Sequence, residues 1–450
     1  MQLFAIPPLL FVYRIAVFSL FLTNLCYNII NMSRRSRKRF STELVIPDSP
    51  IHIDRLATTG QGIGTGNDGV KIFFWNALPG ENVKSYRIIK KRAHLLEAIA
   101  EEVENKNENR VEPKDGQFLS TSPWQIMTDE FEIKSKTEIL KELYRNLLKN
   151  TDKDNKIIFN TDGNSYFYRN KMEYSLYFDF TDKKIKLSIH RRGSHQKLPI
   201  KTSSLERPEI FEKALEIVEK LNAKHDEARK YQSLLLRSNQ NGEVSGGLFE
   251  KGKPHPKFNN LEDKILGKTY SYSPNGFFQI NLPVYEMALK RIKELASNSE
   301  KILDLYSGVG TIGLSILDDK NSTLTKYQSL TLVEVDKSAY KELVENCKTA
   351  EKKLNALVRP ILSKSEEALN YIEPDSVVIL DPPRAGCDKK LIKKLIEIKP
   401  KKIIYLSCNP ITQARDVELL VLAGAKLNSL EGFNFFPKTP HIESLVSLEF

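Results

Sequence analysis

Cysteine is scarce in this sequence. The 450-residue chain has four cysteines, at positions 26, 347, 387 and 408, and none of them lies between Glu112 and Pro123. Isolated thiols in these numbers exclude a disulfide scaffold and a cysteine-ligated metal cage, and they suit a reducing compartment. We therefore predict no metal site, and a cysteine in a distinctive position needs another explanation.

A long uninterrupted apolar run is also missing. Met1–Asn31 is uncharged apart from Arg14, but prolines and asparagines interrupt it, whereas a membrane-spanning helix needs roughly 20 consecutive apolar residues. We interpret residues 1–44 as a disordered or non-native extension, with a true start at Met32 ahead of the basic run Arg34–Arg39. A signal anchor or an organelle presequence is the alternative. Nothing downstream looks extracellular, so we predict a cytoplasmic protein without a membrane partner.

Acidic side chains are too few to balance the basic ones. The sequence has 68 Lys and Arg against 57 Asp and Glu, a formal net charge of +11. A basic chain of this kind favours an anionic partner, most often a nucleic acid, and no obligate protein partner is evident. The length suggests about three domains, and a hydrophobic fraction of 40% is enough to build their cores.

Residues 45–92 alternate short apolar runs with glycines. Strands at this spacing, joined by glycine and proline turns, indicate a small OB-like β-barrel. Such a barrel could merely brace its neighbour. Basic residues gather at its exit, however, which favours contact with RNA: these are Lys84, Arg87, Lys90, Lys91 and Arg92.

Residues 93–260 mix helical and strand patterns, which predicts a central α+β domain. Cations stand beside aromatic residues in Tyr168–Glu173 and in His190–Arg192, and such groups can hold phosphates on an exposed sheet. A solvated face is the alternative. Helical periodicity covers 95–103, 133–148 and 210–221, and strand alternation covers 166–180 and 185–189.

Residues 261–450 repeat the order strand, glycine turn, helix. Alternating β and α units specify a doubly wound, Rossmann-like sheet, so the C-terminal domain is expected to be α/β. The expected strands are 302–306, 330–336, 377–381, 403–406 and 445–450.

The first of these strands ends in a glycine-rich turn, Asp304–Gly310, and the second ends in Glu334. Glycines at this point let the backbone approach a ligand, and a carboxylate one strand later can hold ribose hydroxyls. The turn alone fits NAD, a nucleotide or S-adenosylmethionine. No Walker lysine is present, and two acidic strand ends favour S-adenosylmethionine, which has no phosphate to bind.

Asp381–Gly386 follows a strand of four apolar residues and contains two consecutive prolines. The prolines fix the backbone, so that Asp381 is directed into the cleft at the sheet edge. A flipped-out base needs such a rigid polar shelf. Because Asp-Pro-Pro also occurs in amino-group methyltransferases, this motif does not name the acceptor.

Cys408 follows the apolar strand 403–406 and is carried to the same edge of the sheet. In isolation, a small buried packing residue would be the preferred interpretation. Beside Asp381 and Glu334, the thiol is expected to attack carbon 6 of uracil and so activate carbon 5. Glu443, within the aromatic and proline-rich stretch Phe435–Glu443, is the candidate base for the carbon 5 proton, although in isolation it would be read as a surface charge.

Taken together, these motifs resemble the RNA 5-methyluridine methyltransferase family over residues 45–450. The resemblance is carried by Ser273–Asn281, Asp304–Gly310, Asp381–Gly386, Ser407–Pro410 and Phe436–Glu443, and 45–92 resembles the TRAM domain, an RNA-binding barrel, through Ala77–Glu81. It implies a methyltransferase domain at 261–450, with Cys408 as nucleophile and Glu443 as base. It also implies that the S-adenosylmethionine site is lined by Gln279, Tyr306, Thr311, Glu334 and Asp381.

Two departures from the family pattern qualify this resemblance. Many relatives carry a four-cysteine iron-sulfur cluster after the barrel, and Glu112–Pro123 has no cysteine, so we predict no cluster. Thr311 stands where relatives often have asparagine.

The predicted function is S-adenosylmethionine-dependent methylation of uridine carbon 5 in structured RNA. The resemblance to family members with a TRAM-like barrel implies large-subunit ribosomal RNA, and a transfer RNA loop is the alternative. The rivals are an amino-group methyltransferase and an RNA-binding or folding factor without catalysis.

Overall fold

The computed structural model describes residues 44–92, 95–149, 157–224, 228–297, 299–317, 328–354 and 356–450. The predictions for the apolar stretch and the basic run before Leu44 lie outside these residues. Within them, no helix is both long and apolar enough to cross a membrane.

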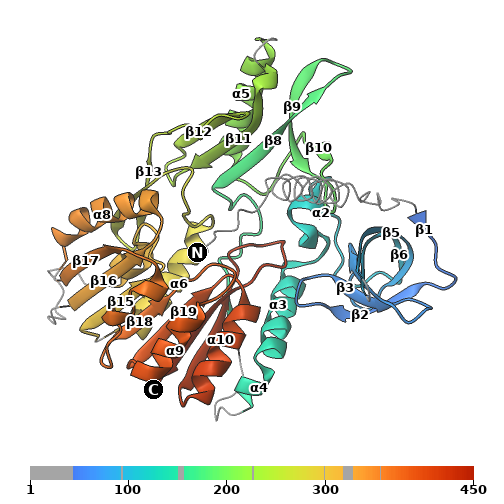
Figure 1. The fold of residues 1–450 in the computed structure, drawn as a ribbon. Coiled ribbons are helices and arrows are strands. Elements are labelled where there is room, and N and C mark those ends of the chain that lie inside the picture. The colour runs from blue at the N-terminus through green and yellow to red at the C-terminus, as the bar shows by residue number, and fades with distance from the viewer. Residues whose placement is uncertain are drawn as a thin grey trace, which may run out of the picture. The chain divides into compact units, whose positions relative to one another are not determined.

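The N-terminal part of the described chain is a small β-barrel, as predicted (Figure 1). Strand β5 pairs with β2 on one side and with β6 on the other, which closes the sheet on itself. Its interior is filled by apolar side chains that include Ile53, Phe74 and Val83. The strands are β1 (Leu44–Val45), β2 (Ile51–Leu56), β3 (Gly62–Thr65), β4 (Lys71–Trp75), β5 (Asn82–Arg92) and β6 (Leu95–Glu104).

Strand β6 corrects the sequence analysis, which expected a helix over 95–103. The segment pairs in parallel with β4 and antiparallel with β5, so it is the strand that completes the barrel. Its Leu, Glu and Ala residues favour a helix, but pairing on both edges overrides that preference. Ala98 and Ala100 are fully buried in the barrel core. The barrel therefore ends at Glu104 rather than at Arg92.

The helices and the strand of the segment after the barrel pack mainly against the C-terminal sheet. Strand β7 pairs with β20 as the edge of that sheet, and Leu140 and Tyr144 belong to the core beneath it. The region expected to form one domain over 93–260 is therefore divided among three cores. The elements of this segment are α2 (Phe118–Thr121), η1 (Pro123–Ile126), α3 (Asp129–Leu143), α4 (Arg145–Leu148) and β7 (Ile158–Asn160).

The remaining central residues form a five-stranded antiparallel sheet in the order β10-β9-β8-β11-β12. Helix α5 covers one face through Ile210, Ala214, Val218 and Leu221, whose spacing of three or four residues produced the helical periodicity. The elements are β8 (Lys171–Asp179), β9 (Lys184–His190), β10 (Lys197–Pro199), α5 (Pro208–Asn222), η2 (Ala228–Lys230), β11 (Tyr231–Ser238) and β12 (Val244–Glu250).

The C-terminal domain contains an eight-stranded sheet in the order β17-β16-β15-β18-β19-β21-β20-β7, the doubly wound arrangement that was predicted. The first five strands in this order are parallel, and β21 runs antiparallel to β19. Its strands are β15 (Lys301–Leu305), β16 (Gln328–Glu334), β17 (Ala356–Leu362), β18 (Val377–Leu380), β19 (Lys402–Ser407), β20 (Lys426–Phe433) and β21 (Glu443–Glu449).

Helices cover both faces of this sheet (Figure 1). Alternate strand residues point to opposite faces, so that Ile302 and Ile404 pack in one core while Leu303 and Ile403 pack in the other. The remaining elements are β13 (Leu261–Ile265), β14 (Lys268–Tyr272), α6 (Leu282–Leu295), α7 (Thr311–Ile316), α8 (Lys337–Glu351), η3 (Ser365–Glu367), η4 (Leu369–Tyr371), α9 (Lys389–Ile398) and α10 (Pro410–Leu422).

The strand order reverses between β15 and β18. At such a point, the connections leave in opposite directions and open a crevice at the carboxyl ends of the strands. The predicted motifs follow β15, β16, β18 and β19, so the fold brings them to this crevice.

Candidate active site

In the turn after β15, glycines leave the backbone exposed to the crevice. Gly308 and Gly310 have φ values of 55° and 89°, in the left-handed region where glycine is favoured. A Cβ on Gly310 would lie 2.6 Å from Leu343 Cδ1, so this glycine is required for packing against α8. A Cβ on Gly308 would meet nothing within 4 Å, which is consistent with its place on the wall of a cavity.

Glu334 ends β16 with its carboxylate held rigidly. It accepts hydrogen bonds from the backbone N–H groups of Gly308, Val335 and Asp336 at 2.8, 2.8 and 2.6 Å. Three N–H donors fix both oxygens in orientation at the edge of the crevice, where a ribose diol could donate to their remaining lone pairs.

Asp304 lies beneath the turn and does not line the cavity. Its Oδ2 accepts from Gly313 N at 2.9 Å, and burial raises the pKa of its carboxyl to about 8. A Cβ on Gly313 would come within 2.7 Å of that oxygen. Asp304 therefore anchors the start of α7 to the end of β15.

The Asp-Pro-Pro shelf after β18 is tied to the loop that carries the thiol. Arg384 O accepts from Asn409 Nδ2 at 2.8 Å and from Thr412 Oγ1 at 3.2 Å. Asp381 begins the shelf and faces the cavity, and burial raises the pKa of its carboxyl.

Cys408 and Glu443 are brought together by antiparallel register. Ser407, the last residue of β19, pairs with Ser444 of β21, so the next pair outward is Cys408 with Glu443. The buried Gln413 fixes both strand ends, because its Nε2 donates to Tyr405 O at 2.6 Å and to Ser444 O at 3.1 Å.

Cys408 and Glu443 have the same charged neighbours, the carboxylate of Asp381 and the guanidinium of Arg384. Burial, together with the carboxylates of Glu443 and Asp381, raises the pKa of Cys408 to about 11, whereas Arg384 acts to lower it. Burial is also the main cause that raises the pKa of Glu443, with Asp381 adding to it. Arg384 was not singled out in the sequence analysis. The signal that could have identified Arg384 as a site residue is that it is the one cationic residue of the Asp381–Gly386 motif.

One cavity of about 1030 Å³ collects most of the predicted residues. Thr311 is not among the residues that line it: it is the buried first residue of α7. The lining includes Gln279, Tyr306, Gly308, Glu334, Asp381, Arg384, Cys408, Phe436 and Glu443.

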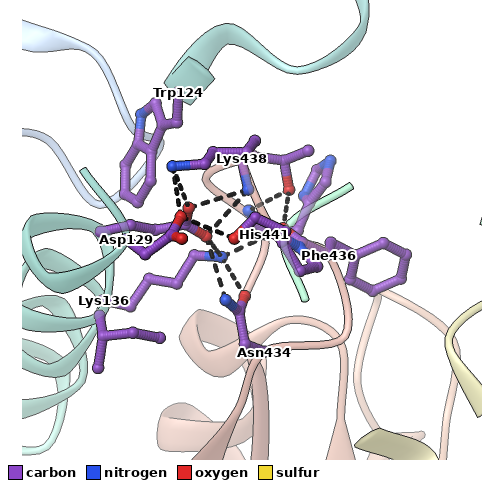
Figure 2. Close-up of polar contacts among 12 residues, drawn as sticks. Trp124, Asp129, Lys136, Asn434, Phe436, Lys438 and His441 are labelled. Carbon is purple, nitrogen blue, oxygen red and sulfur yellow. Dashed lines mark hydrogen bonds and ion pairs between the residues drawn. The ribbon is translucent and has the colours of Figure 1, made fainter. Parts of the chain in front are cut away.

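The loop that leads into β21 is held by a buried charged cluster from α3, which the sequence analysis did not anticipate (Figure 2). Lys136 Nζ donates to Glu132 Oε1 and to Asn434 Oδ1, each at 2.7 Å. Lys438 Nζ lies 2.5 Å from Asp129 Oδ1. In Figure 2 the ring of Phe436 points away from this cluster. Helix α3 thus holds the loop through the charged cluster, while Phe436 of the same loop lines the cavity.

The segment expected to lack an iron-sulfur cluster contains a buried hydrogen-bond network. Asp115 Oδ2 accepts from Gln125 Nε2 at 2.8 Å and from Ser204 Oγ at 2.7 Å. Among the described residues, no group of three or more His, Cys, Asp or Glu side chains could hold a metal ion. In this protein, hydrogen bonds join the segment to the central sheet.

Comparison with known proteins agrees with this arrangement. Residues 259–450 match the family model described as tRNA (uracil-5-)-methyltransferase. An uncharacterized RNA methyltransferase of Enterococcus faecalis is 27% identical over 458 residues, which cover 88% of this chain and 96% of the relative. Another from Treponema denticola is 28% identical over 415 residues, 85% of this chain and 94% of the relative.

A solved structure has a similar fold. Pyrococcus abyssi tRNA (uracil-54, C5)-methyltransferase, in complex with S-adenosyl-L-homocysteine, aligns with a TM-score of 0.66 and 21% identity over 89% of this chain and 100% of its own. In sequence, the chain is thus similar to RNA methyltransferases along most of its length. Within that class, the similarity is to the RNA uracil-5-methyltransferase family, whose model matches the C-terminal domain of this chain.

Proposed function

We propose that this enzyme uses S-adenosylmethionine to methylate carbon 5 of a uridine in structured RNA, through covalent attack by Cys408. The observation that carries the proposal is the placement of Cys408 opposite Glu443 at the mouth of a cavity that also contains Glu334 and the exposed backbone of Gly308.

The cofactor side of the cavity fits S-adenosylmethionine. Glu334 is oriented to accept from ribose hydroxyls, and Gly308 leaves room for the nucleoside against the backbone. Gln279 and Tyr306 supply further polar and aromatic surface on the same wall. S-adenosylmethionine supplies an electrophilic methyl group when bound.

Cys408 supplies the nucleophile. Carbon 5 of uracil is a poor nucleophile on its own, but addition of the thiolate to carbon 6 produces an enolate that is nucleophilic at carbon 5. Arg384 favours the thiolate, because it lowers the pKa that burial raises. Asp381 lines the same cavity, and we assign it to hydrogen bonding with the edge of the bound base.

Glu443 supplies the base. Once carbon 5 carries both a methyl group and its original proton, a carboxylate must remove the proton so that the carbon–sulfur bond can break and the uracil ring is restored. The buried position of Glu443 raises its pKa, which brings its basicity closer to that task.

The net charge of +11 and the barrel beside the methyltransferase domain support RNA as the substrate. Within RNA, we favour large-subunit ribosomal RNA, because the barrel resembles the TRAM domain of family members that act on that RNA. Transfer RNA is the second candidate, because the matching family model and the Pyrococcus abyssi enzyme carry that substrate in their descriptions.

Release of tritium from carbon 5 tests the proposed reaction. Methylation at carbon 5 must expel that proton, so RNA containing [5-³H]uridine should release tritiated water in step with methyl incorporation. Cys408→Ala should abolish both. Methyl incorporation without tritium release, or an active Cys408→Ala enzyme, would instead support an amino-group methyltransferase. A wild-type protein that binds RNA without either signal would support a binding factor.

The RNA substrate is tested separately, with unmodified ribosomal RNA and unmodified transfer RNA as competing acceptors. The proposal expects 5-methyluridine in the ribosomal RNA. Its appearance in transfer RNA alone would assign the second candidate.

A further inference from the structure

One end of the central sheet lies beside the methyltransferase domain, where β8 begins and β11 ends. Lys171 is the first residue of β8, and it pairs with Arg237 of β11. Asn170 immediately precedes Lys171. Three side chains with hydrogen-bond donors therefore stand together at one end of a sheet that contributes no residue to the catalytic cavity.

These side chains bind the backbone of the loop between β14 and α6. Lys171 Nζ donates to Asn275 O at 3.1 Å and to Gly276 O at 3.0 Å. Arg237 Nη2 donates to Phe278 O at 2.7 Å, and its Nη1 donates to Gly276 O at 3.4 Å.

Asn170 continues the same pattern toward α6. Its Nδ2 donates to Gln279 O at 3.0 Å and its backbone N–H donates to Ile280 O at 3.1 Å. Within 275–280, every backbone carbonyl except that of Phe277 is thus bound by one of the three residues.

The loop they hold is one wall of the catalytic cavity. Asn275, Gly276, Phe277 and Gln279 all line it. The Phe277 side chain is 74% exposed, so burial of that ring does not hold the loop in place. The loop belongs to neither a helix nor a strand, so the groups that bind its carbonyls help to hold its shape, together with the buried ring of Phe278.

The burial of Arg237 also indicates positioning. The residue is 1% exposed, and its guanidinium lies 5.3 Å from the ring centroid of Tyr272, which stacks on Phe278 at 3.8 Å. Taking a guanidinium out of water is costly, and apolar side chains of similar volume would often give equal or greater stability. We interpret its two hydrogen bonds to loop carbonyls as the reason why a cation, and not an apolar side chain, occupies this position.

We propose that Asn170, Lys171 and Arg237 are positioning residues that hold loop 275–280 in the shape required to bind the cofactor. None of the three is among the residues that line the catalytic cavity. Their effect is exerted through Gln279 and the backbone around it. The inference rests on the proposed function, since it takes this wall of the cavity as the cofactor side.

Lys171→Met is the first test, because methionine keeps most of the apolar stem and removes both hydrogen bonds. Loss of two bonds of modest net strength should weaken binding of S-adenosylhomocysteine about 10-fold, measured by titration calorimetry on the full-length protein. The KM for S-adenosylmethionine should rise by a similar factor, while kcat changes less than about 3-fold.

Lys186→Met is the matched control. Lys186 lies in β9 of the same sheet, where it pairs with Asp179 and Asp182 and makes no contact with the loop. It should bind S-adenosylhomocysteine as wild type does. Lys171→Arg, which restores a donor, should recover part of the lost affinity, a result that a general loss of stability would not produce.

Wild-type affinity in Lys171→Met, or an equal loss in Lys186→Met, would overturn the inference. Should Lys171→Met fail to fold, Lys171→Gln carries the same prediction with a shorter polar side chain. Failure of the proposed function has a different signature, because the wild-type protein would then release no tritium from RNA containing [5-³H]uridine, whatever its affinity for S-adenosylhomocysteine.

Discussion

At the scale of single residues, the account depends on how one thiol is made reactive in a buried acidic site. Burial and two carboxylates raise the pKa of Cys408 to about 11, and Arg384 is the cation that opposes them. Cys408 and the Asp381–Gly386 shelf could be singled out because each follows a strand whose end is recognisable in the sequence, and Glu443 because it lies in the aromatic and proline-rich stretch before the last strand. The role of Arg384 was missed, because it depends on distance to a cysteine 24 positions away along the chain.

We predict that Arg384→Met makes Cys408 less reactive. A raised thiol pKa means that the thiolate fraction increases only as the pH approaches that pKa, and removing the cation should shift this increase to still higher pH. Alkylation of Cys408 by iodoacetamide, followed by peptide mass spectrometry from pH 7 to 11, measures the shift. At pH 8, a shift of about one unit would slow alkylation about 10-fold.

Arg384→Lys is the control for this prediction. It keeps a cation on a flexible stem and should give an intermediate profile. A profile for Arg384→Met that coincides with the wild-type profile would show that Arg384 does not act on the thiol.

At the scale of elements, local pattern predicted most helices and strands of the described chain. The helix expected over 95–103 was wrong, because β6 is determined by two partner strands and not by its own residues. The contact between α3 and the loop around Lys438 was likewise missed, since its partners lie about 300 residues apart in the sequence. Contacts of this range have no signature in a single sequence.

We predict that Lys136→Met destabilises the protein by about 3 kcal/mol, because it leaves Glu132 with its main cation removed in a fully buried site. Chemical denaturation measures the change. The control is Lys141→Met on the same helix: its exposed pair with Glu138 should contribute less than about 1 kcal/mol. Equal effects of the two substitutions would contradict a structural role for the buried cluster.

At the scale of the whole described chain, the barrel contacts the loop that leads to Glu443. Trp124 Nε1 donates to Gly60 O at 2.9 Å, and a Cβ on Gly60 would lie 2.2 Å from Pro440 Cβ. The barrel itself could be predicted from glycine spacing. The contact of the barrel with Pro440 could not be predicted. The sequence does not reveal which distant side chain occupies the space beside a glycine, where other residues have a Cβ.

We predict that Gly60→Ala displaces Pro440 and lowers kcat for methyl transfer about 10-fold or more, as small misplacements near a reacting group do. Gly69→Ala is the matched control. Both glycines have positive φ values, of 94° and 77°, but a Cβ on Gly69 would meet nothing within 4 Å. Gly69→Ala should therefore introduce a similar backbone strain from the positive φ, but it should leave kcat unchanged because its Cβ displaces no neighbouring atom. Similar kcat values for the two variants would contradict a link between the barrel and the catalytic loop.

The central claim is that Cys408 bonds to carbon 6 of a uracil in RNA. Its most direct test is incubation of the enzyme with S-adenosylmethionine and RNA containing 5-fluorouridine, because fluorine at carbon 5 cannot be removed as a proton and the covalent complex should persist. The account predicts a denaturation-resistant protein–RNA adduct whose modified peptide contains Cys408, and no adduct with Cys408→Ala. An adduct on another residue, or methyl transfer to ordinary RNA by an enzyme that forms no adduct with the fluorinated RNA, would contradict it.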